Sequence, residues 1–177
     1  MGCRTRVFEN RFGPKTSIAR GNLSFTTINI VKLAIECMNI EDREDRIHEF
    51  FKKLDWALEI SAKQLNERFN FQKTALKKQF PLLMGSLWMD SDKIGDNDTI
   101  ESVINHGTLG IGFIGLAETL IALIGKHHGE SAEAQELGLR IVTFMRSKVN
   151  EFCETYKHNF SVLATPAEGL AGRFTRG

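Results

Sequence analysis

The chain has few cysteines and almost no net charge, and its cysteines and histidines are not spaced as metal ligands are. Its three cysteines, Cys3, Cys37 and Cys153, are widely spaced and form no Cys-x-x-Cys pair, so neither a zinc site nor a redox dithiol is indicated. The same cysteine usage favours an intracellular, reducing compartment, and we expect a cytoplasmic protein. His127 and His128 have no third ligand spaced near them, so we predict no metal site. A formal net charge of +1 gives no indication of a nucleic-acid partner, and none is expected.

Long apolar runs are also missing. None reaches the roughly 20 residues that a membrane-spanning helix needs, so no membrane partner is expected. The first residues, Met-Gly-Cys-Arg-Thr-Arg, are followed by no apolar stretch and do not resemble a signal peptide. With 42% hydrophobic residues over 177 positions, the chain can form one domain with a core.

Helical spacing of apolar residues dominates the middle of the chain. A first stretch begins near Ile30, a long amphipathic helix is predicted from about Glu44 to Phe69, and another begins near Ser131. Two or three short strands make no stable sheet alone, so the pattern indicates a helix-rich α/β piece of something larger. The candidate strands are Val7–Phe8, Leu23–Thr26 and Phe160–Ala164.

A glycine motif lies between these segments. Gly110-Ile-Gly-Phe-Ile-Gly115 matches G-x-G-x-x-G, which is a weak signal by itself. A dinucleotide site requires a strand before the motif, and Ser102–Thr108 is poor strand sequence. We therefore expect close backbone packing at the start of a helix that ends at Gly125. Glu118 in that helix is either exposed at its edge or paired in a site.

Two more helix starts are predicted from capping patterns. Asp98 and Glu101 resemble a capping box that opens a short helix. The Thr-Pro-Ala-Glu segment at 165–168 has a threonine cap, a proline at the first helical position and a glutamate at the third. Such a start is either a well-formed helix entry or an anion site, because its N–H groups and dipole attract phosphate.

The three cysteines have different surroundings. Cys37 and Cys153 lie on apolar helix faces and are expected to pack in the core. Cys3 lies in a small, polar, glycine-flanked loop near Arg4 and Arg6, whose charges favour a thiolate. Polar residues this dense usually belong to a site, because burying them unpaired costs free energy.

Four motifs occur in one order along the chain. They are Met-Gly-Cys-Arg-Thr-Arg-Val at 1–7, Gly-Asn-Leu-Ser-Phe-Thr-Thr at 21–27, Gly-Ile-Gly-Phe-Ile-Gly-Leu-Ala-Glu at 110–118, and Leu-Ala-Thr-Pro-Ala-Glu-Gly-Leu-Ala-Gly-Arg-Phe at 163–174. This order resembles the anaerobic (class III) ribonucleoside-triphosphate reductases, a family of oxygen-sensitive glycyl-radical enzymes. The resemblance covers residues 1–177 and a central part of the family's length. It implies part of a ten-stranded α/β barrel with a finger loop through its centre.

The resemblance also implies a division of the chain and a chemistry. The chain would be a single partial domain with the finger loop at 1–25, a helical barrel segment at 26–158, and the phosphate-loop strand and helix start at 159–177. Cys3 looks like the thiyl-radical cysteine at the finger tip, which takes the 3′-hydrogen of a ribonucleoside triphosphate before the 2′-hydroxyl leaves as water. The product would be a deoxyribonucleoside triphosphate for DNA synthesis.

The other site residues come from the same resemblance. Asn22 looks like the family's substrate-contacting asparagine, with Ser24 as a neighbour. Substrate phosphates would meet the helix start formed by Thr165, Ala167 and Glu168. The motif at 110–118 looks like a strand-to-helix turn lining the barrel, without a catalytic role.

Reductant, cofactors and partners are implied in the same way. Met1, counted among the substrate-binding residues, stands two positions before Cys3, where formate-using members carry methionine, so formate is the expected reductant. The glycyl radical and the four-cysteine zinc site of the family lie outside this segment, which we therefore expect to be inactive alone. A radical-SAM activating enzyme and a homodimer would be the partners of the full-length enzyme. The alternative is a non-catalytic helical nucleotide-binding or scaffold protein, with no dependence on Cys3.

Overall fold

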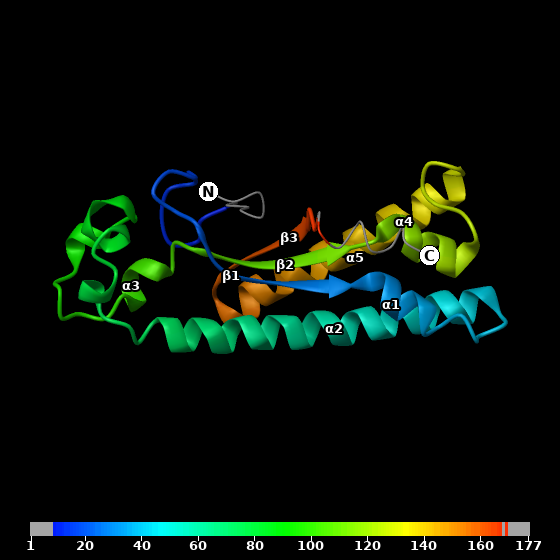
Figure 1. Ribbon diagram of the computed structural model, residues 1–177, viewed down its shortest axis with the longest axis horizontal. Coiled ribbons are helices and arrows are strands. Elements are labelled where there is room, and N and C mark those ends of the chain that lie inside the picture. Colours follow the sequence, from blue (N-terminus) through cyan, green and yellow to red (C-terminus); the bar gives the residue numbers. More distant parts are fainter. Residues whose placement is uncertain (1–8, 168, 170–177) are drawn as a thin grey trace.

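A three-stranded parallel sheet forms the centre of the molecule (Figure 1). The computed structural model describes residues 9–167 and Gly169. The strands follow one another in space as they do in sequence: β1 (Asn22–Asn29), β2 (Thr108–Ile114) and β3 (Asn159–Ala164). The predicted mixed α/β class is confirmed, and the ten-stranded barrel stays an expectation from the resemblance.

Helices connect the strands in the way that parallel pairing requires. Between β1 and β2 lie α1 (Ile30–Ile35) and α2 (Arg43–Gln72), and between β2 and β3 lie α4 (Leu116–Ile124) and α5 (Ala132–Tyr156). The long helices predicted from Glu44 and from Ser131 are both confirmed. The segment 26–158, expected to be helical, also contains the end of β1 and all of β2.

Side-chain caps explain where the two long helices begin. The Asp42 carboxylate accepts a hydrogen bond from the Asp45 backbone N–H at 2.9 Å, and the Ser131 hydroxyl accepts one from Ala134 N–H at 3.1 Å. Both caps satisfy backbone donors that a helix start leaves unpaired. Helix α4 ends at Gly125, as predicted, with φ of 79° at that glycine.

A lobe of short turns follows α2. It contains η1 (Lys77–Gln79), η2 (Leu83–Leu87), η3 (Ser91–Lys93) and α3 (Glu101–Ile104). The capping box predicted for α3 is wrong. Asp98 instead accepts a hydrogen bond from Gly95 N–H at 2.8 Å and closes the preceding turn, while Glu101 pairs with Lys73 at 2.9 Å.

Strand β2 corrects the prediction for the glycine motif. Residues 108–114, which are not among the candidate strands, form the central strand and are buried along their whole length, whereas the poor strand sequence before them, 102–107, forms no strand. Leu109, Ile111 and Phe113 belong to the buried core, whereas the glycines between them leave room on the other face for side chains from β1 and the end of β3. The glycines in this strand are therefore explained by the close approach of side chains from the neighbouring strands and not by β-propensity. The strand-to-helix turn implied by the resemblance is confirmed at Gly115, whose φ of 80° favours glycine.

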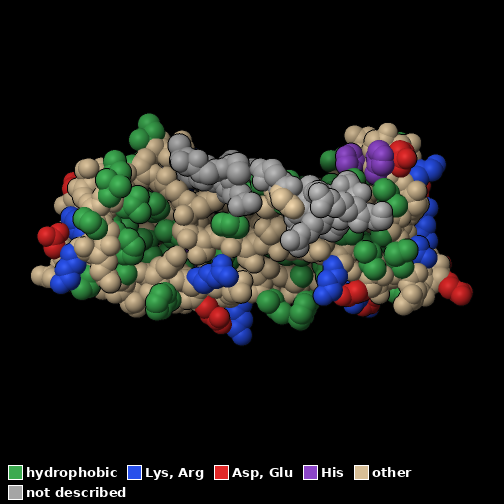
Figure 2. Space-filling view, in the orientation of Figure 1, with side chains coloured by type: hydrophobic (Ala, Val, Ile, Leu, Met, Phe, Trp, Pro, Cys, Tyr) green, Lys and Arg blue, Asp and Glu red, His purple; other side chains and the backbone are tan. Residues whose placement is uncertain are grey.

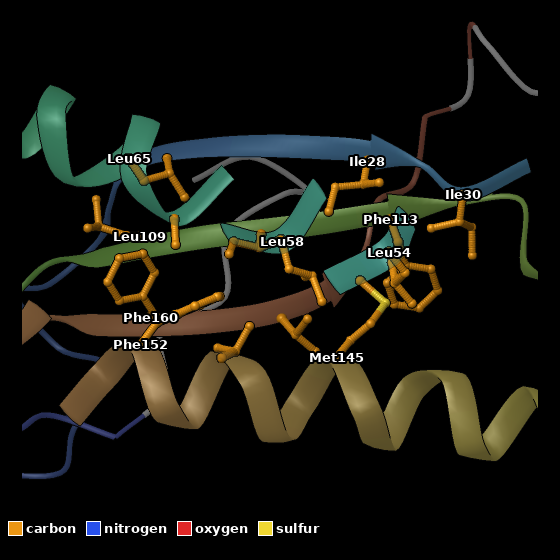
Figure 3. Close-up of a cluster of buried hydrophobic side chains, with 14 of the residues drawn as sticks. Ile28, Ile30, Leu54, Leu58, Leu65, Leu109, Phe113, Met145, Phe152 and Phe160 are labelled. Carbon is orange, nitrogen blue, oxygen red and sulfur yellow. The ribbon is translucent and has the colours of Figure 1, made fainter. Parts of the chain in front are cut away.

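The core lies between one face of the sheet and helices α2 and α5 (Figure 3). Cys37 is fully buried in the turn after α1, and Cys153 on α5 packs against the core, as predicted. Burial raises the pKa of both thiols. The core side chains are Ile28, Leu109, Ile111, Phe113, Phe160 and Val162 from the sheet, Phe50, Leu54, Leu58, Ala62 and Leu65 from α2, and Leu137, Ile141, Met145, Val149 and Phe152 from α5.

His158 joins the start of β3 to α2. Its ring lies 4.0 Å from the Phe69 ring, its Nε2 is 3.1 Å from Asn66 Oδ1, and its Nδ1 is buried without a hydrogen-bond partner. Burial, with a smaller contribution from the Lys73 charge, lowers the pKa of His158. The folded chain therefore favours the neutral imidazole.

A depressed pKa at His158 predicts acid sensitivity. The unfolded chain binds a proton at this side chain below about pH 6.5 while the folded chain resists it, so the free energy of unfolding should fall as the pH drops from there toward the lowered pKa. Urea unfolding midpoints of the chain, compared at about pH 7.5 and about pH 5.5, measure this loss. We expect His158→Gln to reduce the loss, and the matched variant His128→Gln, at an exposed position, to leave it unchanged. An equal loss in both variants would contradict the prediction.

Candidate functional site

A pair of threonine hydroxyls lies at the carboxyl end of the sheet. Thr27 Oγ1 on β1 and Thr165 Oγ1, just after β3, are 3.0 Å apart. They meet over β2 at Gly112, where a Cβ atom would lie 2.0 Å from Thr165 Oγ1 and 2.9 Å from Thr27 Oγ1. Only a residue without a side chain lets the two outer strands bring their hydroxyls together across the central strand.

Thr165 is bound to the sheet and does not cap a helix. Its backbone N–H donates to Phe113 O at 2.9 Å, which extends the β2–β3 pairing by one residue. Residues 165–167 are not helical, and Ala167 has a φ of 37°. The prediction of a threonine cap with proline at the first helical position is therefore wrong, because the backbone N–H of Thr165 bonds to the sheet and its hydroxyl bonds to Thr27. Glu168 lies outside the described residues.

The carboxyl ends of parallel strands are the usual binding edge of open α/β sheets. Helix α4 begins at this edge directly after β2, and Glu118 in its first turn is exposed, which answers the question its sequence position left open. Each threonine hydroxyl has one proton, and because one of them donates to the other, the pair has one proton left to donate. The edge is thus suited to an acceptor-rich group such as a phosphate.

Asn22 and Ser24 lie at the opposite end of β1. Asn22 Oδ1 accepts a hydrogen bond from Thr108 Oγ1 at 2.7 Å, which orients its amide. The Ser24 hydroxyl accepts from Gln72 Nε2 of α2 at 3.4 Å, so it lies on the helix-covered side of the sheet. The structure therefore places Asn22 but not Ser24 in reach of the face that carries Thr27.

Asn22 and Thr165 are separated by the length of the strands. Asn22 pairs with Thr108 and Thr165 follows the last pair of the sheet, so about six residues, or roughly 20 Å, lie between their backbone levels. A ligand touching both would have to lie along the sheet face. Ser161, paired with Gly110 midway along that face, has a buried hydroxyl without a hydrogen-bond partner. Sequence reasoning missed Ser161, although Asn159, Ser161 and Thr165 stand at alternating positions.

An apolar cavity of about 580 Å³ opens beside Asn22, between the end of α2 and the lobe at 73–107. Figure 2 shows hydrophobic side chains gathered on this end of the molecule. None of the described residues that line the cavity is charged, so it suits a neutral group and not a phosphate. The larger side chains that line the cavity are Phe71, Phe80, Leu83, Met84 and Trp88.

Several predicted features fall outside the described residues or are absent within them. Cys3 and Met1 precede the described part of the chain, as does the candidate strand Val7–Phe8. Over residues 9–167 and Gly169, no group of three or more His, Cys, Asp or Glu side chains could hold a metal ion. No helix of this same part is both long enough and apolar enough to cross a membrane.

The fold is that of a segment of a parallel α/β protein. The carboxyl ends of its strands form the kind of edge at which such proteins usually bind ligands. The family described as anaerobic ribonucleoside-triphosphate reductase matches residues 1–177, and the chain belongs to that family. The anaerobic ribonucleoside-triphosphate reductase of Escherichia coli is 28% identical over 184 residues, covering 99% of this chain and 24% of that protein. The bacteriophage T4 enzyme of the same name is 26% identical over 180 residues, covering 99% and 28%. The chain thus spans about a quarter of the length of these relatives.

Proposed function

We propose that this chain is the segment of an anaerobic ribonucleoside-triphosphate reductase that combines the finger loop with one wall of the substrate site. The protein carrying it would reduce ribonucleoside triphosphates to deoxyribonucleoside triphosphates by thiyl-radical chemistry. The observation that carries the proposal is the Thr27–Thr165 hydroxyl pair over Gly112, at the binding edge of a sheet in a chain of this family.

The hydroxyl pair is assigned to the substrate phosphates. Hydrogen bonds from neutral hydroxyls to a charged phosphoryl oxygen are stronger than neutral pairs. In the Thr27–Thr165 contact one hydroxyl donates to the other, so the hydroxyl that accepts keeps its own proton for a phosphoryl oxygen beside the pair. Phosphate binding here would use the Thr165 hydroxyl beside the sheet and not as a helix cap, and it keeps Thr165 as a substrate-binding residue.

The ribose end is assigned to Asn22 and Cys3. Thr108 holds the Asn22 amide in one orientation, which a group that binds ribose hydroxyls requires. Cys3 would take the 3′-hydrogen, which demands a sulfur in van der Waals contact with one C–H bond. Ser24 is not part of this assignment, since α2 uses its hydroxyl.

Reductant and partners follow from family membership. The family uses a glycyl radical, which would oxidise Cys3 when the whole enzyme is assembled. Formate as reductant, a radical-SAM activating enzyme, a homodimer and a cytoplasmic location complete the proposal, with Met1 as the residue that favours formate.

Thr165→Val tests the assignment of the phosphates in the full-length protein that carries this sequence. Valine keeps the shape but removes the hydroxyl, so we expect the KM for a ribonucleoside triphosphate to rise by about 10- to 100-fold, the value of one hydrogen bond to a charged group. The kcat should change little, because the phosphates are held equally in ground and transition states. Steady-state formation of deoxynucleotide measures both constants.

Thr119→Val is the matched control. Thr119 on α4 is fully buried and its hydroxyl has no hydrogen-bond partner, so the same substitution should leave KM unchanged. A protein that binds nucleotide through Thr165 but forms no deoxynucleotide would be the non-catalytic nucleotide-binding module. A protein that binds no nucleotide would be the scaffold alternative, and either result would overturn the reductase assignment.

A further inference from the structure

His106, two residues before β2, is a buried histidine whose ring nitrogens face two different parts of the chain. The residue is 3% exposed. Its Nε2 lies 3.1 Å from Asp90 Oδ2 in the lobe, and its Nδ1 lies 3.1 Å from Asn10 Nδ2 in the loop at 9–20. This loop lies between the lobe and the start of the sheet (Figure 1). The protonation state of one ring therefore decides which of the two contacts can form.

Backbone groups fix the orientation of the Asn10 amide. The Phe12 backbone N–H can only donate, and it lies 3.1 Å from Asn10 Oδ1, so this atom is the amide oxygen. Asn10 Nδ2, on the other side, lies 3.4 Å from Pro14 O, which can only accept. Asn159 Nδ2 also donates to Asn10 Oδ1, at 3.4 Å. These contacts leave the amide nitrogen of Asn10 as a donor toward His106.

The hydrogen bonds require a neutral ring at His106. Its Nδ1 accepts from Asn10 and therefore needs a free lone pair, while Nε2 carries the proton that the Asp90 carboxylate accepts. A proton added to Nδ1 would set two donors against each other. Turning the Asn10 amide over would offer its oxygen to the ring, but it would then direct its nitrogen at the Phe12 N–H. Protonation of His106 thus costs a hydrogen bond in either arrangement.

Two charged groups contact His106, and they act in opposite directions. Asp90 attracts a protonated ring, and its own pKa is lowered by a hydrogen bond to Lys93, with a smaller contribution from His106, so it stays a carboxylate. Arg20, which is 7% exposed, donates from Nε to His106 O at 2.7 Å and brings a cation close. The Asp90 contact does not involve the loop, so a protonated His106 keeps it while Asn10 moves away. Protonation therefore favours the form in which the loop has left the ring.

The other charged groups of the neighbouring elements have partners of their own. Glu9 pairs with Lys15 at 3.8 Å, and Arg11 pairs with Glu154 of α5 at 2.7 Å. His158, which precedes β3, packs its ring on α2. Among the described residues, these interactions include no contact to the His106 ring.

We propose that His106 is a proton-sensitive latch for the first part of the loop, residues 9–14. The neutral ring accepts from Asn10 and holds this segment against the starts of β2 and β3, and the protonated ring releases it. Histidine is the side chain whose charge ordinarily changes between about pH 5 and 8. Gly13 packs over the contact, since a Cβ atom there would lie 3.1 Å from Asn10 Nδ2 and 3.2 Å from His106 Cε1. The latch involves no residue of the proposed nucleotide site.

Backbone hydrogen exchange of the peptide that contains residues 9–14 measures the latch in the full-length protein that carries this sequence. The Arg11 N–H donates to Asn159 Oδ1 at 3.0 Å and the Phe12 N–H donates to Asn10 Oδ1, so both amides lose protection when the segment leaves. Mass spectrometry follows the exchange at about pH 7.5 and about pH 5.5, on either side of the usual histidine titration. An unstructured copy of the peptide corrects for the intrinsic effect of pH on exchange. We expect the protection to fall by about tenfold at the lower pH, the value of one buried hydrogen bond.

His106→Asn and Asn10→Asp test the latch in two independent ways. The asparagine amide offers an acceptor near the place of Nδ1 but does not titrate, so His106→Asn should give equal protection at both pH values. An aspartate carboxylate accepts from the protonated ring, so Asn10→Asp should keep at the lower pH the protection that the parent loses. His158→Gln is the matched control, because it removes a titrating histidine that does not face the loop, and it should keep the response of the parent.

Equal protection of the parent segment at the two pH values would overturn the latch, and so would a response that persists in His106→Asn. An Asn10→Asp variant that opens at the lower pH as the parent does would show that the ring does not hold the segment through Asn10. Peptides from α5 are measured in the same samples. If they lose protection in step with the segment, the chain unfolds as a whole and the latch is refuted. Each variant decides by itself, so a failure of one to fold leaves the other as the test.

Discussion

A Cys3→Ala variant of the full-length protein that carries this sequence is expected to form no deoxynucleotide, while it still binds ribonucleoside triphosphate with unchanged affinity. A methyl group cannot carry the thiyl radical, and no other side chain can take its place at the same C–H bond. Loss of an essential reacting group removes about as much rate as loss of a whole catalytic set, on the order of 10⁶-fold in well-studied cases. Product formation and nucleotide binding are measured separately to distinguish a chemical defect from a binding defect.

Cys153→Ala is the control for this prediction. Burial raises the pKa of the Cys153 and Cys37 thiols, and the Cys153 thiol donates to Phe160 O at 3.5 Å, so both side chains are protonated packing groups at neutral pH. Removing the Cys153 sulfur should cost some stability and leave the chemistry intact. Turnover that persists in Cys3→Ala, or disappears in Cys153→Ala, would show that the reacting cysteine has been misassigned.

The helices could be predicted from the sequence because their signals are local. Periodic apolar residues between Glu44 and Phe69 specify the buried face of α2, and the cap at Ser131 specifies the first turn of α5. These patterns need no knowledge of the partner surface. The same holds for the end of α4 at Gly125, where a positive φ favours glycine.

The sheet was harder to predict, because its central strand depends on neighbours distant in sequence. Gly110 and Gly112 weaken β2 as an isolated strand. In the sheet they fit, because Phe25 and Leu163 pack close to Gly110 and the threonine pair packs close to Gly112. Thr165 shows the same limit. Its local sequence is typical of a helix cap, but the sheet and Thr27, 138 positions away, use its groups instead.

The polar network around His106 illustrates a third kind of limit. Asn10, Asp90, His106 and Asn159 are far apart in sequence and none carries a motif, so only the folded chain brings them together. The family resemblance located Asn22 and Thr165 without showing that they lie at opposite ends of the sheet. Local sequence therefore specifies the helices, and long-range strand pairing specifies the candidate site.

Gly112→Ala is expected to have the second-largest effect on the proposed activity. The new Cβ atom would lie 2.0 Å from Thr165 Oγ1 and 2.9 Å from Thr27 Oγ1, so the hydroxyl pair must separate. One substitution then disturbs the proposed phosphate site, and the KM for a ribonucleoside triphosphate should rise by at least the 10- to 100-fold expected for loss of one hydrogen bond. Overpacking should also lower the free energy of unfolding by about 1–3 kcal/mol.

Gly110→Ala supplies the comparison within the same strand and on the same face. Its Cβ atom would lie 3.3 Å from Leu163 Cδ2 and 3.3 Å from Phe25 Cβ, so small shifts of apolar groups accommodate it and no hydroxyl moves. We expect a modest loss of stability and an unchanged KM. If the two alanine variants raise KM equally, general strain in β2 explains the effect, and the threonine pair loses its assignment to the phosphates. If only Gly112→Ala raises KM, the convergence of Thr27 and Thr165 is the feature that binds the nucleotide.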